Sequence, residues 1–153
     1  MRLRRASLAA ALLSSLLAMT ACAAEPVANA ASVAEAPVRV VYQISDGNEQ
    51  ALRGLRNIGN HLDADPSAKI VVVALGRGVD FLLDGAKDSN GQPFDASVAG
   101  LTARGVEFLI CGNTLHKLAI PDSKVNPEAR MVPSGMAELA RLQAREGYAY
   151  LRP

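Results

Sequence analysis

The sequence contains few of the side chains that commonly carry catalysis. Its 153 residues include no tryptophan, two histidines and two cysteines, and aromatic residues make up only 4%. So few aromatic residues predict a modest hydrophobic core. The two histidines, His61 and His116, give no basis for assigning a Ser-His-Asp triad. Cys22 lies in an N-terminal targeting segment, so the folded part holds a single thiol, Cys111, and forms no internal disulfide.

Patterns that would hold a metal or a nucleotide are also missing. Asp80 and Asp84 have helical i,i+4 spacing but lack a histidine or a third acid, so we expect no metal site. Gly76 and Gly78 begin a glycine pattern in which Phe81 occupies the place of the third glycine of a dinucleotide fingerprint. No P-loop pattern follows them. We therefore predict no cofactor.

The longest apolar stretch lies at the N-terminus and is too short to span a bilayer comfortably. Leu8 to Met19 follows a basic region that contains Arg2, Arg4 and Arg5. This pattern predicts a secretory signal over residues 1–21 and an exported protein. Removing those residues takes away three arginines and no acid, which changes the net charge from +1 to −2. A nucleic-acid partner is therefore not expected.

Two modes of processing remain open at the end of the signal. Met19-Thr20-Ala21-Cys22 resembles a bacterial lipobox, in which Cys22 would be lipidated and would anchor the protein to the outer membrane. Ala21-Cys22-Ala23 instead fits the small-x-small rule of ordinary signal peptidase, which would release a periplasmic protein. Residues 22–37 are rich in alanine and lack periodicity, as is typical of a tether.

The hydrophobic pattern beyond residue 37 alternates between strand and helix periods. It predicts strands over 38–44, 69–75, 106–110, 130–132 and 148–151, with helical segments between them. The run 70–74 is continuously apolar and mostly β-branched, as expected for a strand covered on both faces. Residues 38–153 are therefore predicted to form one α/β sandwich domain with a mostly parallel five-stranded sheet.

Capping residues mark the ends of two of the predicted helices. Ser45 or Asp46 is expected to cap the first helix. Ser134 is expected to cap the last helix, and Gly147 to end it. The apolar face of that last helix is predicted to carry the side chains Met136, Leu139, Ala140 and Gln143.

Cys111 is the strongest candidate for chemistry. In parallel sheets, the loops after the carboxyl ends of the strands share one edge, which here gathers residues 45–48, 76–78, 111–114 and 133–135. N–H groups at the start of the helix after Cys111 would favour a thiolate. The residues expected to approach a small anion at this edge are Gly76, Gly78, Gly112, Asn113 and Thr114.

Each candidate also has a plainer interpretation. Cys111 would be inert if it were simply buried, as free cysteines often are. His116 would polarise the thiol if it faced Cys111, or would be an ordinary solvated histidine. Arg77 and Lys117 would attract an anionic sulfur compound or a persulfide-bearing partner, or would simply be solvated.

Several segments of the chain resemble the DsrE/DsrF-like family. The matching positions are Val40 to Gly47, Ala74-Leu75-Gly76, Gly105 to Phe108 with Cys111 and Leu115, Ser134 to Leu139, and Gly147 to Tyr150. The resemblance implies a three-layer α/β/α fold and a homo- or hetero-oligomer, of which we expect a homo-oligomer. In the sulfur-relay branch it also implies a persulfide on one cysteine and protein partners that donate or accept sulfur. Only Cys111 fits that cysteine.

Three functions follow as hypotheses. The first is a sulfur carrier that holds a persulfide on Cys111. The second is a non-catalytic oligomeric module that binds a ligand or partner and in which the cysteine is structural. The third is a thiol redox sensor.

Overall fold

The computed structural model describes residues 36–153. The signal over residues 1–21 and nearly all of the tether over 22–37 lie outside the described residues, so these two assignments stay predictions. Within the described part, no helix combines the length and apolar character needed to cross a membrane.

Five strands form one sheet in the order β4-β3-β2-β1-β5. They are β1 (Arg39–Ile44), β2 (Lys69–Ala74), β3 (Glu107–Cys111), β4 (Ala129–Val132) and β5 (Ala149–Leu151). Every pairing between neighbouring strands is parallel. The predicted α/β class with a mostly parallel five-stranded sheet is therefore confirmed.

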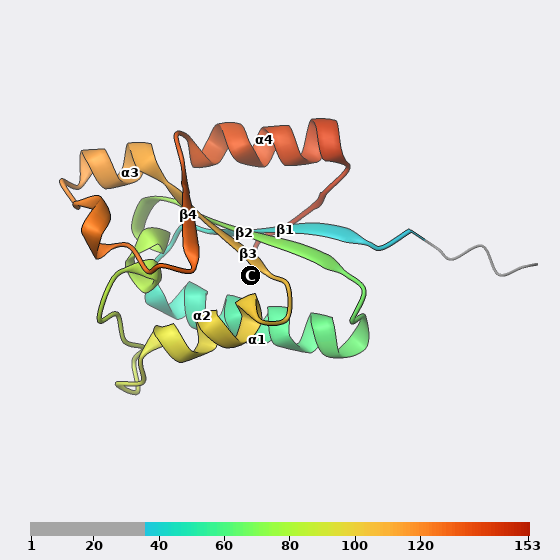
Figure 1. Ribbon diagram of the computed structural model, residues 1–153, viewed down its shortest axis with the longest axis horizontal. Helices are drawn as coiled ribbons and strands as arrows, with labels where there is room; N and C mark the ends of the chain where they lie inside the picture. Colours follow the sequence, from blue (N-terminus) through green and yellow to red (C-terminus); the bar gives the residue numbers. More distant parts are fainter. Residues whose placement is uncertain (1–35) are drawn as a thin grey trace, which may run out of the picture. The chain divides into compact units, whose positions relative to one another are not determined.

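Helices cover both faces of this sheet and make three layers (Figure 1). The α-helices are α1 (Asn48–Ala64), α2 (Phe94–Thr102), α3 (Gly112–Lys117) and α4 (Gly135–Glu146), and the short 3₁₀ helices are η1 (Gly76–Leu82) and η2 (Asp122–Lys124). In the view of Figure 1, α1 and α2 lie below the sheet, and α3 and α4 lie above it. All strands point their carboxyl ends to one edge, where α3 and α4 begin.

The alternation of side chains along the strands gives the domain two hydrophobic layers. Tyr42 and Val72 belong to the larger layer, which α1, α2 and η1 complete. Val41 and Val73 point the other way and pack with Leu139 of α4 in the smaller layer. Because β1, β2 and β3 are covered on both sides, their buried residues are apolar on both faces, as the continuous apolar run over 70–74 predicts for β2.

The start of α1 differs from the prediction. Neither Ser45 nor Asp46 caps the helix: the N-cap residue is Gly47, with a φ of 97°, and no side chain caps it. Instead, a side chain inside the helix bonds back to the turn before it: Oε1 of the buried Gln50 accepts from the N–H groups of Ser45 at 2.7 Å and Asp46 at 2.8 Å. Its Nε2 donates to the carbonyl of Pro153 at 3.2 Å, so one side chain ties the β1–α1 turn to the C-terminal residue.

The predicted ends of α4 are confirmed. Ser134 Oγ accepts from the N–H of Ala137 at 3.3 Å, and Gly147 ends the helix in the left-handed region with a φ of 71°. The buried face differs from the prediction, because α4 buries Leu139 and Leu142 while 61% of Met136 is exposed. Ala140 and Gln143 are exposed as well, so Leu139 alone of the four predicted residues is buried.

Candidate functional site

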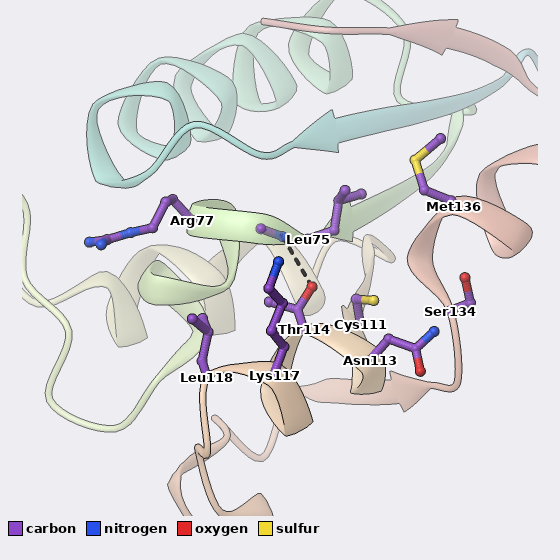
Figure 2. Close-up of a pocket in the computed structure, with 10 residues that line it drawn as sticks. Leu75, Arg77, Cys111, Asn113, Thr114, Lys117, Leu118, Ser134 and Met136 are labelled. Atoms are coloured by element: carbon purple, nitrogen blue, oxygen red, sulfur yellow. Dashed lines mark hydrogen bonds between the residues drawn. The ribbon is translucent and has the colours of Figure 1, made fainter.

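A pocket of about 450 Å³ opens at the edge where the strands have their carboxyl ends. The residues that line it are Leu75, Gly76, Arg77, Cys111, Asn113, Thr114, Lys117, Leu118, Ser134 and Met136. They come from the residue after β2 and the start of η1, from the end of β3, from α3 and the residue after it, and from the start of α4. Figure 2 shows Cys111 between Thr114 on one side and Ser134 on the other, with Asn113 below it.

Cys111 ends β3 at the base of this pocket and is only 5% exposed. Its Sγ accepts a hydrogen bond from the backbone N–H of Gly135 at 3.2 Å. Gly135 is the first residue of α4, which is 12 residues long, so the sulfur lies at the positive end of a full helix dipole. The sequence predicts N–H groups from the helix that directly follows Cys111, and the structure adds a donor 24 residues away.

The surroundings of Cys111 favour its thiolate. Burial acts to raise the pKa of the thiol, but it is outweighed by hydrogen bonds from the Thr114 side chain and from the backbone N–H groups of Gly135, Thr114 and Asn113. The pKa of Cys111 is therefore lowered from its ordinary value. The hydrogen bond from α4 reaches the sulfur directly at 3.2 Å, whereas the N–H of Asn113 at the start of α3 also donates to the carbonyl of Pro133 at 3.1 Å.

Gly135 can approach the sulfur only because it has no side chain. A Cβ atom at this position would lie 3.2 Å from the Cβ of Cys111 and 3.3 Å from the Cβ of Leu75. Both neighbours are anchored at strand ends and have little freedom to move. The glycine therefore makes possible the close contact between α4 and the end of β3.

Two cationic side chains line the pocket. Arg77 is paired with Asp80, with 2.8 Å between Nη2 and Oδ2. Lys117 is exposed and forms no ion pair within residues 36–153. Lys117 therefore contributes the less compensated positive charge of the two.

Some predicted site residues lie elsewhere. Gly78, Gly112 and His116 do not line the pocket, whereas Gly76, Asn113 and Thr114 do. Gly78 packs against β1, where an added Cβ would lie 2.1 Å from the carbonyl oxygen of Ile44. His116 is exposed on α3. Sequence reasoning placed the 133–135 loop on this edge but missed that Gly135 contacts the sulfur, since no local pattern encodes that contact.

Acidic, histidine and cysteine side chains do not gather into a metal site here. Within residues 36–153, no group of three or more of them could hold an ion. His61 instead bonds Tyr42, with 3.0 Å between Nδ1 and the phenol oxygen. The side chains of the pocket that carry or can acquire charge are the thiol of Cys111 and the cations Arg77 and Lys117.

The fold and the site together define a class of protein: a three-layer α/β/α domain with a parallel sheet and one thiol at the edge where the strands end. A sequence model of the DsrE/DsrF-like family matches residues 27–153, so the chain belongs to that family, which is associated with sulfur relay. The resemblance seen in the sequence is thereby confirmed.

Solved structures agree with this assignment. The chain is similar to MTH1491, a protein of unknown function from Methanobacterium thermoautotrophicum, with 32% identity and a TM-score of 0.67 over 76% of this chain and 99% of that one. It shares its fold with the ychN protein from E. coli, with 17% identity and a TM-score of 0.61 over 76% and 98% of the two chains. Comparison with curated proteins gives no match.

Proposed function

We propose that this protein is a sulfur carrier that holds sulfane sulfur as a persulfide on Cys111. The observation that carries the proposal is the hydrogen bond from Gly135 N–H to Cys111 Sγ at the base of an open pocket. The same donors that lower the pKa of the thiol would stabilise the anionic persulfide. Membership of a family associated with sulfur relay supports the same chemistry.

The proposed cycle has two displacements at sulfur. In the first, the Cys111 thiolate attacks the sulfane sulfur of a donor, a new S–S bond forms, and the donor's S–S bond breaks with its electron pair on the leaving group. In the second, the thiolate of an acceptor protein attacks the terminal sulfur. The bond from Sγ to that sulfur breaks, and Cys111 leaves as a thiolate, for which its low pKa suits it.

Intact-mass analysis after exposure to inorganic polysulfide tests this cycle. The wild type should gain the mass of one sulfur atom and lose it with reductant, whereas Cys111→Ser should gain none. The loaded protein should then pass its sulfur to an acceptor thiol. A wild type that gains no sulfur, or that keeps it in the presence of an acceptor thiolate, would contradict the proposal.

The burial of Cys111 favours a second candidate. At 5% exposure the thiol is nearly covered, as expected for a structural cysteine in a module that binds a ligand or partner without reacting. That candidate predicts slow alkylation until denaturant is added, and a Cys111→Ser variant that loses stability. The carrier predicts fast alkylation near neutral pH. A redox sensor would also alkylate fast, but peroxide would convert it to a sulfenate or mixed disulfide and it would transfer little sulfur.

The cellular setting is part of the proposal. The basic and apolar N-terminus supports an exported carrier, periplasmic or anchored to the outer membrane through Cys22, with sulfur-donating and sulfur-accepting proteins as partners. A homo-oligomer is expected because a domain of this size with so few aromatic residues has a modest core. A sedimentation experiment should therefore give more than the monomer mass at micromolar concentration, and a monomer would rule out the oligomer.

A further inference from the structure

We propose that the pocket selects one class of sulfur donor: small organic anions that carry the sulfane sulfur beside an apolar body, as organic thiosulfonates do. The inference rests on the proposed function, because it concerns the donor that loads Cys111. It goes beyond that function by assigning specificity to Lys117, Leu118 and Met136.

The first argument is size. The pocket volume of about 450 Å³ lies in the range that holds small organic ligands, about 300 to 1,000 Å³. Hydrogen sulfide or thiosulfate would occupy a small part of it and leave the walls in contact with water. A donor with a ring or chain would instead fill the space between α3 and the start of α4.

The second argument is the apolar surface at the mouth. Residues 36–153 leave five large hydrophobic side chains exposed, and two of them, Leu118 at 44% and Met136 at 61%, line this pocket. Half-buried Leu75 also lines the pocket, and in Figure 2 it lies between Leu118 on one side and Met136 on the other. Exposed apolar side chains grouped around a hollow mark a binding surface, because burying them against an apolar ligand is favourable.

The third argument is charge. A thiolate and an anionic donor repel each other, so a site that brings them together needs positive charge near both. Lys117 has no ion pair within the described chain, and it lies on α3, the helix that also supplies Thr114 beside the thiol. An ammonium group there would attract the sulfonyl oxygens, while Leu118 and Met136 contact the apolar body.

The transfer balances without another reagent. The Cys111 thiolate attacks the outer sulfur of the thiosulfonate and forms the Sγ–S bond. The bond from that sulfur to the sulfonyl sulfur breaks, and the electron pair leaves with an organic sulfinate. Two negative charges enter the reaction and two leave it, one on the persulfide and one on the sulfinate. The transferred atom is sulfane sulfur in both the donor and the persulfide, so no oxidant or reductant is needed.

Binding can be tested without sulfur transfer. Benzenesulfonate, which has the anionic head and the ring but no sulfane sulfur, is titrated into the purified protein while the amide NMR signals of Asn113 and Gly135 are followed. We expect saturable shifts with a dissociation constant of about 1 to 10 mM, as suits a ligand of this size. Methanesulfonate and benzenesulfonamide, which lack the ring and the charge respectively, should bind at least about fivefold more weakly.

Matched variants assign the specificity. Lys117→Gln should weaken benzenesulfonate binding about fivefold, the effect of one charge–charge interaction near water, whereas Lys69→Gln at the amino end of β2 should leave it unchanged. Leu118→Gln should weaken it by a similar factor. Leu151→Gln, which alters a leucine of similar exposure (42% against 44%) on β5, should not. Thermal melts establish that each variant is folded.

Loading rates separate this inference from the proposed function. Benzenethiosulfonate should load Cys111 at least about tenfold faster than methanethiosulfonate in the wild type, and the advantage should shrink in Leu118→Gln. The donor assignment is wrong if the two thiosulfonates load Cys111 equally fast, or if benzenesulfonate shifts no signal. In either case the proposed carrier function is retained as long as polysulfide loads Cys111. If benzenesulfonate binds but no donor loads the thiol, the proposed carrier function is wrong, and the pocket is a binding site for organic anions that have an apolar body.

Discussion

The backbone N–H of Gly76 donates a hydrogen bond to Thr114 Oγ1 at 3.1 Å (Figure 2). This bond joins the turn after β2 to the first turn of α3, next to the thiol. Because the Thr114 oxygen accepts from Gly76, its own proton remains free to donate. That donation is among the interactions that lower the pKa of Cys111. One hydroxyl therefore links the geometry of two strand-end loops to the ionisation of the sulfur.

Replacing Thr114 by valine should raise the pKa of Cys111. The change keeps the shape of the side chain but removes the hydroxyl that favours the thiolate. The rate of iodoacetamide alkylation against pH measures the pKa. The wild-type profile should rise at a pH below the reference of about 8.5, and the Thr114→Val profile should move to higher pH.

Thr114→Ser is the matched control, because it keeps the hydroxyl and should keep the wild-type profile. An unchanged profile in Thr114→Val would show that the hydroxyl does not act on the thiol.

The lowered pKa of Cys111 also predicts how the stability of the protein depends on pH. Since it is lower in the folded protein than in the unfolded chain, the unfolded chain binds more protons between the two values. The free energy of unfolding, relative to Cys111→Ala, should therefore rise with pH up to about 8.5 and be lost as the pH falls through the folded pKa.

Gly135→Ala should both destabilise the protein and raise the pKa of Cys111. The new Cβ would lie 3.2 Å from the Cβ of Cys111 and 3.3 Å from Val73 Cγ1, so α4 must move away from the strand ends. We expect the free energy of unfolding to fall by about 1 to 3 kcal/mol in urea titrations. Alkylation should also slow near neutral pH, because the N–H of residue 135 would leave the sulfur.

Gly59→Ala on α1 is the control for that change. A Cβ at Gly59 meets no atom within 4 Å, so the alanine should leave stability unchanged or increase it by up to about 1 kcal/mol. If Gly135→Ala behaves like Gly59→Ala in both stability and alkylation, then the close approach of α4 to the sulfur contributes neither to stability nor to the pKa of Cys111.

Gly78→Ala should destabilise the protein more than any other glycine replacement considered. The Cβ of the alanine would lie 2.1 Å from the carbonyl oxygen of Ile44. That oxygen belongs to the backbone of a buried strand residue, so it cannot move aside as a flexible side chain could. A loss of about 3 kcal/mol or more in the free energy of unfolding is expected by calorimetry or urea titration. If Gly78→Ala instead kept wild-type stability and lost only ligand binding, Gly78 would belong to the binding site after all.

Processing at Cys22 should depend on its thiol. If the lipobox is used, cells fed labelled fatty acid should incorporate the label into the wild type and not into Cys22→Ser, because the lipid is attached through that sulfur. Gel autoradiography of the membrane fraction measures this. Recovery of an unlabelled wild-type chain that begins at Ala24 or Glu25 would indicate ordinary signal peptidase instead.

The order of the strands and helices could be predicted because each signal is local. The apolar run over β2 indicated a strand covered on both faces, and Ser134 and Gly147 marked the ends of α4. The prediction was wrong where a distant residue overrode the local one. The carboxylate of Asp46, which was expected to cap α1, is instead bound by the guanidinium group of Arg152 at 2.8 and 2.9 Å, and Arg152 is 106 residues away.

By itself the sequence determined the fold class, the single thiol of the folded part and the edge of the sheet at which that thiol lies, because these depend on periodicity and on the shared direction of parallel strands. Only the tertiary structure decided what surrounds the thiol. The N–H of Gly135 reaches Cys111 from 24 residues away, and Met136 and Lys117 meet at one pocket from different helices. Such contacts depend on how α4 packs on the sheet, and packing distances of a few ångströms are set by all the buried side chains together rather than by any one segment.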